Sequence, residues 1–187
     1  MDGTDISFAP SWSEFEAAHH LYRTPCTATP QNAYLNGEHF FHFLSLEDLR
    51  TNRWEQGSGF FADGSHLYVR FPGGAPPGTN RLNIPRWTTG LTLDCRHHIH
   101  VRGLEFCYYG LGTYHRGIYI NGGSSNLVER CRFHHSVIGV ALKRAANFNT
   151  IQYCDFHESP LSQWSWHAVK DGGVGYEAGG VVVYDSS

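Results

Sequence analysis

The sequence is poor in charge and has no long apolar run. Charged residues make up 17% of the 187 residues, and 14 Lys and Arg against 17 Asp and Glu leave a net charge of −3. Nucleic-acid binding calls for a basic surface, so this balance predicts no nucleic-acid partner. No apolar stretch approaches the roughly 20 residues of a membrane-spanning helix. We therefore expect no membrane partner either.

Two kinds of structural framework are also missing. The five cysteines do not form the pattern of a disulfide framework. His97, His98 and His100 suggest a metal, but adjacent histidines on a strand point to opposite faces. No cysteine or carboxylate completes that set. The sequence therefore predicts no metal site, and it leaves any cofactor unknown.

Glycine is abundant, with 21 residues, and it marks a repeat. One pattern occurs three times, opening with Gly and alternating apolar residues and closing on a β-type segment that ends in Phe. The copies open at Gly90, Gly117 and Gly139 and close at Phe106, Phe133 and Phe156, which are 16, 16 and 17 residues further on. The loops from each Phe to the next opening Gly have 10, 5 and 23 residues. A part of fixed length followed by a loop of free length is typical of a solenoid turn.

The repeated segments are too short for helices and alternate with period two, so they predict stacked β-strands. We expect three columns of side chains inside the coil, spaced about 4.8 Å along it. They are Val101, Val128 and Ile151; Leu104, Cys131 and Cys154; and Phe106, Phe133 and Phe156. Asn126 and Asn149 share one register position and should form a short hydrogen-bonded ladder over two rungs.

These segments, HVRGLEF (100–106), NLVERCRF (126–133) and NTIQYCDF (149–156), resemble the right-handed parallel β-helix (pectate-lyase-like) family of carbohydrate-active proteins. The resemblance covers residues 88–187. It implies an all-β fold and polysaccharide processing by a glycoside hydrolase or a polysaccharide lyase. It also implies an extracellular or periplasmic location, although no signal peptide is visible. A non-catalytic carbohydrate-binding or adhesive solenoid is the alternative, so whether the protein is an enzyme stays open.

Residues 1–87 are expected to form an N-terminal segment and a small β-hairpin cap subdomain over the first rung. Asn36-Gly37 and Asp63-Gly64 predict two hairpins, and Ser45 followed by Asp48 predicts a helix start. Residues 12–18 are expected to form one or two helical turns. At the other end, residues 180–183 open a fourth copy that stops at Ser187, so we expect a truncated coil that self-associates through its last strand.

The free-length loops should leave one corner of the coil, with a low rung between two high ones. The expected result is an aromatic cleft for a polysaccharide or oligosaccharide, because sugar rings stack on aromatic side chains. The proposed substrate-binding residues are Tyr108, Tyr109, Tyr114, Trp164, Trp166 and His135. These aromatic residues could instead only pack the loops onto the coil.

Acids and bases near this corner supply the catalytic candidates. They are His134, His157, Lys170, Asp171 and Glu177. His134 and His157 directly follow equivalent phenylalanines and should stack, either as an acid–base pair or as a structural ladder. Hydrolysis needs two carboxylates, whereas elimination needs a base and a cation that neutralises the substrate acid. The spacing selects neither reaction.

Overall fold

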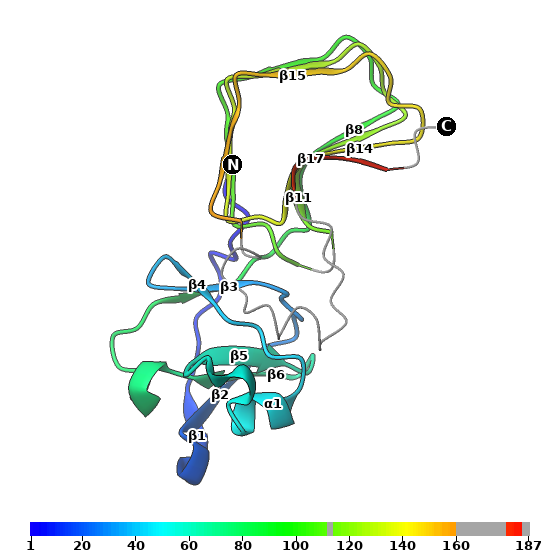
Figure 1. Cartoon of the computed structure of the whole chain (residues 1–187). Helices are drawn as coiled ribbons and strands as arrows, with labels where there is room; N and C mark the ends of the chain where they lie inside the picture. Colours follow the sequence, from blue (N-terminus) through cyan, green and yellow to red (C-terminus); the bar gives the residue numbers. More distant parts are fainter. Residues whose placement is uncertain (112–113, 160–178, 185–187) are drawn as a thin grey trace. The chain divides into compact units, whose positions relative to one another are not determined.

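The computed structural model describes residues 1–111, 114–159 and 179–184, which fold as two compact units (Figure 1). One unit contains residues 1–4 and the described residues from 86 onward; the other contains residues 5–85. The regular secondary structure of the described chain is almost entirely β-strand, with one short α-helix, α1 (Leu46–Arg50). The 3-10 helices η1 (Ala17–His19), η2 (Arg53–Glu55) and η3 (Pro72–Gly74) have one turn each.

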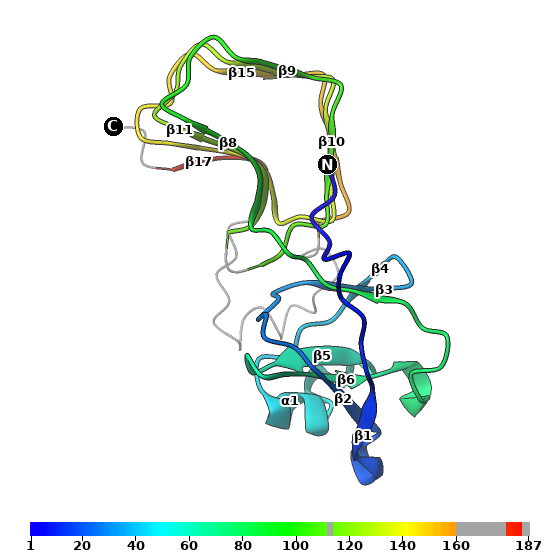
Figure 2. The same ribbon diagram turned by 180° about the vertical axis from the view of Figure 1, so that it is seen from behind.

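Three parallel sheets make up the first unit. Their strands, in spatial order, are β17 (Gly179–Tyr184), β14 (Ile138–Lys143), β11 (Arg116–Asn121) and β8 (Thr89–Asp94); β15 (Thr150–Gln152), β12 (Leu127–Glu129) and β9 (His100–Arg102); and β10 (Glu105–Cys107), β13 (Arg132–His134) and β16 (Asp155–His157). Each of the three complete turns visits each sheet once, β17 opens a fourth turn, and the turns superpose in both views (Figures 1 and 2). An all-β unit of this kind is consistent with a parallel β-helix.

The register of the sheets confirms the repeat alignment. Phe106 pairs with Phe133, and Phe133 with Phe156, while Val128 lies between Val101 and Ile151. Adjacent rungs therefore place equivalent side chains directly above one another.

Phenylalanine rings fill the coil where the opening glycines leave room. The Phe106 and Phe133 rings stack with centroids 5.1 Å apart and planes 7° from parallel. A Cβ atom on Gly117 would lie 2.6 Å from Phe133, and one on Gly139 would lie 2.3 Å from Phe156. Real Cβ atoms do not approach so closely, so the second and third rungs each pair their opening glycine with their closing phenylalanine ring across the core.

One of the three expected core columns is only partly inside. Cys131 is buried and Cys154 is half-buried, but Leu104 is 41% exposed, so the expectation was wrong for Leu104. Leu104 belongs to the first rung, whose strands β9 and β10 are edge strands of their sheets. An edge rung has a neighbour on one side only, which leaves part of this side chain uncovered.

The asparagine ladder is confirmed. Asn149 Oδ1 accepts hydrogen bonds from the backbone N–H and the side-chain amide of Asn126, both at 2.9 Å. Asn126 Oδ1 in turn accepts from the Ile99 N–H at 2.9 Å. The two asparagines thus satisfy turn backbone groups across three rungs.

The first residues of the chain cover the free edge of β10. Asp2 forms a parallel bridge with Cys107, and the Gly3 N–H donates to the Cys107 carbonyl at 2.9 Å. The Cys107 N–H donates to the Met1 carbonyl at 3.1 Å. Backbone groups that an edge strand would expose are therefore paired here.

The second unit holds two antiparallel sheets and its own apolar core. The first contains β1 (Ser13–Glu16), β2 (Leu21–Pro25), β6 (His66–Arg70) and β5 (Gly59–Ala62), and the second contains β4 (Glu38–Phe40), β3 (Ala33–Leu35) and β7 (Leu82–Asn83). Both predicted hairpins are present, and φ is 55° at Asn36 and 91° at Gly37, as a tight primed turn requires. The Ser45 side chain caps α1 by accepting from the Asp48 N–H at 3.0 Å.

The expected helical turns at residues 12–18 were largely wrong. Glu14 pairs with Tyr22 in an antiparallel ladder, and only η1 follows it. The Phe15 ring packs edge-on against Tyr68 with centroids 5.0 Å apart. This contact across the sheet outweighs the weak local helix preference of the segment.

Candidate functional site

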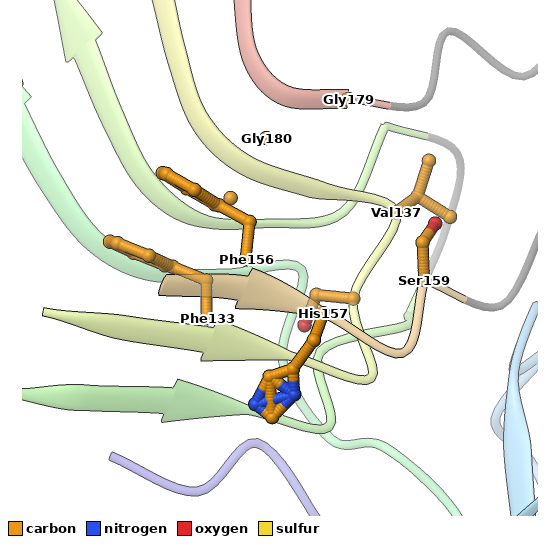
Figure 3. Close-up of a pocket in the computed structure, with 9 residues that line it drawn as sticks. Phe133, Val137, Phe156, His157, Ser159, Gly179 and Gly180 are labelled. Atoms are coloured by element: carbon orange, nitrogen blue, oxygen red, sulfur yellow. The ribbon is translucent and has the colours of Figure 1, made fainter. Parts of the chain in front are cut away.

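The outer face of the β10–β13–β16 sheet gathers ionisable side chains in a grid that we call the histidine face. Side chains alternate along a strand, so an inward Phe has outward neighbours on both sides. Figure 3 shows Phe133 and Phe156 pointing to one side of the sheet and His157 to the other. The three columns of the grid, in rung order, are Glu105, Arg132 and Asp155; Cys107, His134 and His157; and Tyr108, His135 and Glu158.

The third column depends on a left-handed backbone conformation. Tyr108, His135 and Glu158 each follow the last strand residue of their rung, with φ of 62°, 53° and 50°. In this conformation the chain leaves the strand, so strand alternation no longer applies. His135 therefore lies against its neighbour His134 with ring centroids 4.9 Å apart.

Two carboxylates flank one guanidinium in the first column. Glu105 Oε1 lies 3.5 Å from Arg132 Nη1, and Asp155 Oδ2 lies 3.7 Å from Arg132 Nε. The acids are two rungs apart, so about 10 Å or less separates the two carboxylates. All three side chains are exposed, and the electrostatic energy of these pairs is correspondingly small.

Each of these carboxylates also faces a histidine of the second column. His134 Nε2 lies 3.3 Å from Glu105 Oε1, and His157 Nε2 lies 3.9 Å from Asp155 Oδ2. The two imidazoles stack with centroids 5.1 Å apart and planes 20° from parallel, as their equivalent positions predict. The face thus holds two carboxylate–imidazole pairs on either side of Arg132.

A second contact network joins the second and third columns. His134 Nδ1 lies 2.6 Å from His135 Nδ1, and His135 Nδ1 lies 3.2 Å from Glu158 Oε2. The Tyr108 ring covers His135 at 4.8 Å between centroids. Burial, followed by the nearby Cys107 and acidic groups, raises the pKa of the Tyr108 hydroxyl. His134, His135 and Glu158 offer ligand atoms that could hold a metal ion.

Two of the histidines in the 97–100 segment, which suggested a metal from the sequence, contact other side chains in the structure. His97 Nδ1 lies 2.8 Å from Ser124 Oγ, and His100 Nε2 lies 3.2 Å from Glu129 Oε1. Glu129 also receives a hydrogen bond from Gln152 at 3.0 Å, which together with Arg102 and His100 lowers the pKa of its carboxyl.

The first column opens into a hollow of about 410 Å³, which we call the acid hollow. Its lining residues are Gly103, Leu104, Glu105, Arg130, Cys131, Arg132, Tyr153 and Asp155. Tyr153 is exposed and has φ of 54°, so its ring stands at the edge of the hollow instead of inside the coil. An aromatic ring, two acids and a guanidinium therefore share one open surface.

The predicted substrate-binding residues separate in the structure. Tyr108 and His135 lie on the histidine face. Tyr109 was wrongly placed on a wall, because it is 2% exposed, its hydroxyl donates to the Met1 carbonyl at 3.2 Å and its ring packs on Gly90. Tyr114 is exposed and contacts Tyr184 edge-on at 6.2 Å. Trp164, Trp166, Lys170, Asp171 and Glu177 lie outside the described residues.

Tyr114 belongs to a second hollow of about 260 Å³, which we call the tyrosine hollow. It is lined by Tyr114, Arg116, Tyr119, Lys143 and Tyr184. The Arg116 guanidinium lies over the Tyr119 ring, 4.0 Å from its centroid. Aromatic rings and two cations here could receive a saccharide that carries acidic groups.

Sequence reasoning overlooked Glu105, Arg132 and Tyr153. Glu105 and Arg132 each come directly before a closing Phe that points into the coil. Strand alternation alone therefore places them on the outer face, the same face as the residue that comes directly after that Phe. Tyr153 carries no comparable signal, because its orientation depends on its left-handed backbone.

No family model matches the sequence, and no curated protein matches it. Among solved structures, "The complex structure of XylC with xylose" has a TM-score of 0.61 with this chain at 12% sequence identity. The superposition covers 99% of this chain and 45% of the other, so this chain spans less than half the length of XylC. At this identity, the likeness shows a shared fold. In the described residues, no helix is long and apolar enough to cross a membrane.

Proposed function

We propose that this chain forms part of a polysaccharide-processing, right-handed parallel β-helix protein that acts outside the cytoplasm, in the periplasm or the extracellular space. Two findings support the proposal: the fold shared with a protein solved with xylose, and the acid pair on the histidine face. Right-handed crossovers are the rule for parallel strands, which supports the proposed handedness. The observation that carries the function is Glu105 and Asp155 flanking Arg132 in an open hollow.

Hydrolysis fits this arrangement better than elimination. Inverting glycosidases hold two carboxyl groups about 6.5–9.5 Å apart, leaving room for a water molecule, and two rungs of the sheet give a comparable spacing. One carboxyl group would protonate the leaving oxygen while the other activates water. Elimination instead needs a cation for the substrate's own carboxylate, and Arg132 already faces two acids of the protein.

The neighbouring side chains have supporting roles in this proposal. His134 and His157 exchange protons with Glu105 and Asp155, to which their Nε2 atoms are adjacent. Tyr153 stacks on a sugar ring at the edge of the acid hollow. Trp164 and Trp166 remain proposed stacking residues, and Lys170, Asp171 and Glu177 remain proposed catalytic residues.

The test is turnover of oligosaccharides by the full protein and by single variants. Glu105→Gln and Asp155→Asn should each lower kcat at least 100-fold, since general acid–base catalysis contributes that much. Glu129→Gln is the matched control, because Glu129 is an acid on the neighbouring sheet and should leave kcat unchanged. Activity that persists in both site variants would contradict the proposal.

The alternative, a carbohydrate-binding solenoid without catalysis, is favoured by the tyrosine hollow. Its two cations suit an acidic polysaccharide, and such binding weakens as salt rises. Tyr119→Ala should then reduce binding of an acidic oligosaccharide, while Glu105→Gln should not. Binding without turnover in the unaltered protein would favour this alternative.

A further inference from the structure

Three potential metal ligands converge where β13 and β16 end. His134, His135 and Glu158 each offer one ligand atom, and these three atoms lie within 4.8 Å of one another. Two come from adjacent residues of one rung and the third from the rung above, so the repeat itself brings them together. Two imidazole nitrogens and one carboxylate oxygen form a typical set for Zn²⁺ or Fe²⁺, leaving coordination positions open for water or substrate.

The hydrogen-bonding capacity of His135 is too small for its two close neighbours. Its Nδ1 atom lies 2.6 Å from His134 Nδ1 and 3.2 Å from Glu158 Oε2. An imidazole nitrogen carries either one hydrogen or one lone pair, so it makes a good hydrogen bond to only one of them. A single cation between the three atoms would satisfy all of them at once.

The spacing requires only a small adjustment. Zn–N bonds of about 2.0–2.1 Å in tetrahedral geometry place neighbouring ligand atoms roughly 3.3 Å apart. The distance from His135 Nδ1 to Glu158 Oε2 already matches this value. The two Nδ1 atoms are 2.6 Å apart and must separate by about 0.7 Å, which rotation of one imidazole ring provides.

The surroundings of His134 match those of a metal-bound histidine. Metal ligands of this type usually donate their second ring N–H to a carboxylate, which fixes the tautomer. His134 presents Nδ1 to the cluster, and its Nε2 lies 3.3 Å from Glu105 Oε1. Both histidine side chains are largely buried, at 13% and 12% exposure, and stacking on His157 and Tyr108 holds their rings.

From this geometry we propose that His134, His135 and Glu158 bind one divalent transition-metal ion, with Glu105 orienting His134. The strand alternation invoked for His97 and His98 does not apply to His134 and His135, because His135 lies in the left-handed region. The metal proposal does not rest on the proposed hydrolysis, although Glu105 and His134 take part in both.

The test is titration of the chelator-treated full protein with Zn²⁺, followed calorimetrically, and with Co²⁺, followed by its visible absorption. We expect one equivalent to bind saturably, with a Co²⁺ spectrum of nitrogen and oxygen ligation. His135→Ala and Glu158→Gln should each abolish the one-equivalent binding. Glu105→Gln should weaken it about 10- to 100-fold without changing the stoichiometry, as loss of an orienting carboxylate does.

The His100–Glu129 pair supplies the matched control. It is another histidine–carboxylate pair at 3.2 Å, so His100→Ala should leave binding unchanged. Absence of saturable binding to the unaltered protein would overturn the proposal and leave a proton shared between the two Nδ1 atoms. Binding retained in both His135→Ala and Glu158→Gln would also overturn it. No saccharide is present in these titrations, so their failure and a failure of hydrolysis are separate results.

Discussion

Phe133 and Phe156 stack face to face across one rung spacing, with ring centroids 4.9 Å apart and planes 8° from parallel. With Phe106 they form a continuous column inside the coil, and the opening glycines Gly117 and Gly139 face the Phe133 and Phe156 rings. The same repeat that buries these rings presents the histidine face on the other side of the strands. Stability and function therefore depend on one register.

Truncation of the central ring should be costly. Phe133 is 2% exposed and has a stacked ring on each side, so Phe133→Ala should lower the free energy of unfolding by about 3–5 kcal/mol. Urea unfolding followed by circular dichroism measures this change. Phe148→Ala is the control, because Phe148 is 87% exposed and its loss should have little effect. Equal effects of the two substitutions would contradict the stacked core.

The glycine–phenylalanine pairing gives a second prediction. A Cβ on Gly139 would lie 2.3 Å from Phe156, so Gly139→Ala should destabilise the chain by about 1–3 kcal/mol through overpacking. Combining it with Phe156→Leu should recover part of this loss, because the smaller side chain leaves room for the new methyl group. A double-mutant cycle measures the coupling. Strictly additive effects would show that the two residues do not share this space.

Much of the fold was predictable because the repeat spacing, the alternation of apolar residues and the turn residues all indicate the same β-structure. The spacing from Gly117 to Phe133 reflects a contact across the coil, and turn residues such as Asn36-Gly37 need a particular backbone conformation. Where two interactions compete, local sequence is insufficient. Phe15 lies in a strand because of its contact with Tyr68, and Leu104 is exposed because its rung is an edge.

The site was predictable only in part, for a geometric reason. Equivalent positions indicated that His134 and His157 stack, and they do. Alternation along a strand would separate the side chains of His134 and His135, but the positive φ of His135 brings both to the same cluster. A sequence does not reliably predict which residues other than glycine, asparagine and aspartate adopt a left-handed backbone conformation. The metal-ligand set could therefore not be recognised before the backbone was known.

Acid should destabilise the second unit through His42. Burial lowers the pKa of His42 to about 4, and its Nδ1 has no hydrogen-bond partner among the described residues. In the unfolded chain His42 has its ordinary pKa near 6.5, so the unfolded state binds a proton more readily than the folded state does. The folded state is therefore destabilised as the pH falls from about 6.5 to 4. The loss is on the order of 3 kcal/mol.

The check on His42 is the pH dependence of urea unfolding between pH 7 and pH 4. His42→Phe should flatten the acid side of the curve, because it removes the proton site and keeps an aromatic ring against Phe60. His98→Gln, at an exposed histidine, should leave the slope unchanged. An unaltered slope in His42→Phe would show that His42 does not govern this pH range.

The last strand should promote self-association. In the described chain, β17 is an edge strand of the β17–β14–β11–β8 sheet. Val181 and Val183 are 43% and 62% exposed, although their partners Val140 and Leu142 one rung earlier are buried. An edge strand that exposes apolar side chains can serve as a template for another strand. Sedimentation velocity over a concentration series should therefore show association.

Val183→Lys should reduce this association by adding charge at the edge. Phe148→Lys, which adds a charge at an exposed apolar residue away from the edge, should not. A protein that is monomeric at high concentration, or equally affected by both substitutions, would rule out β17 as the contact.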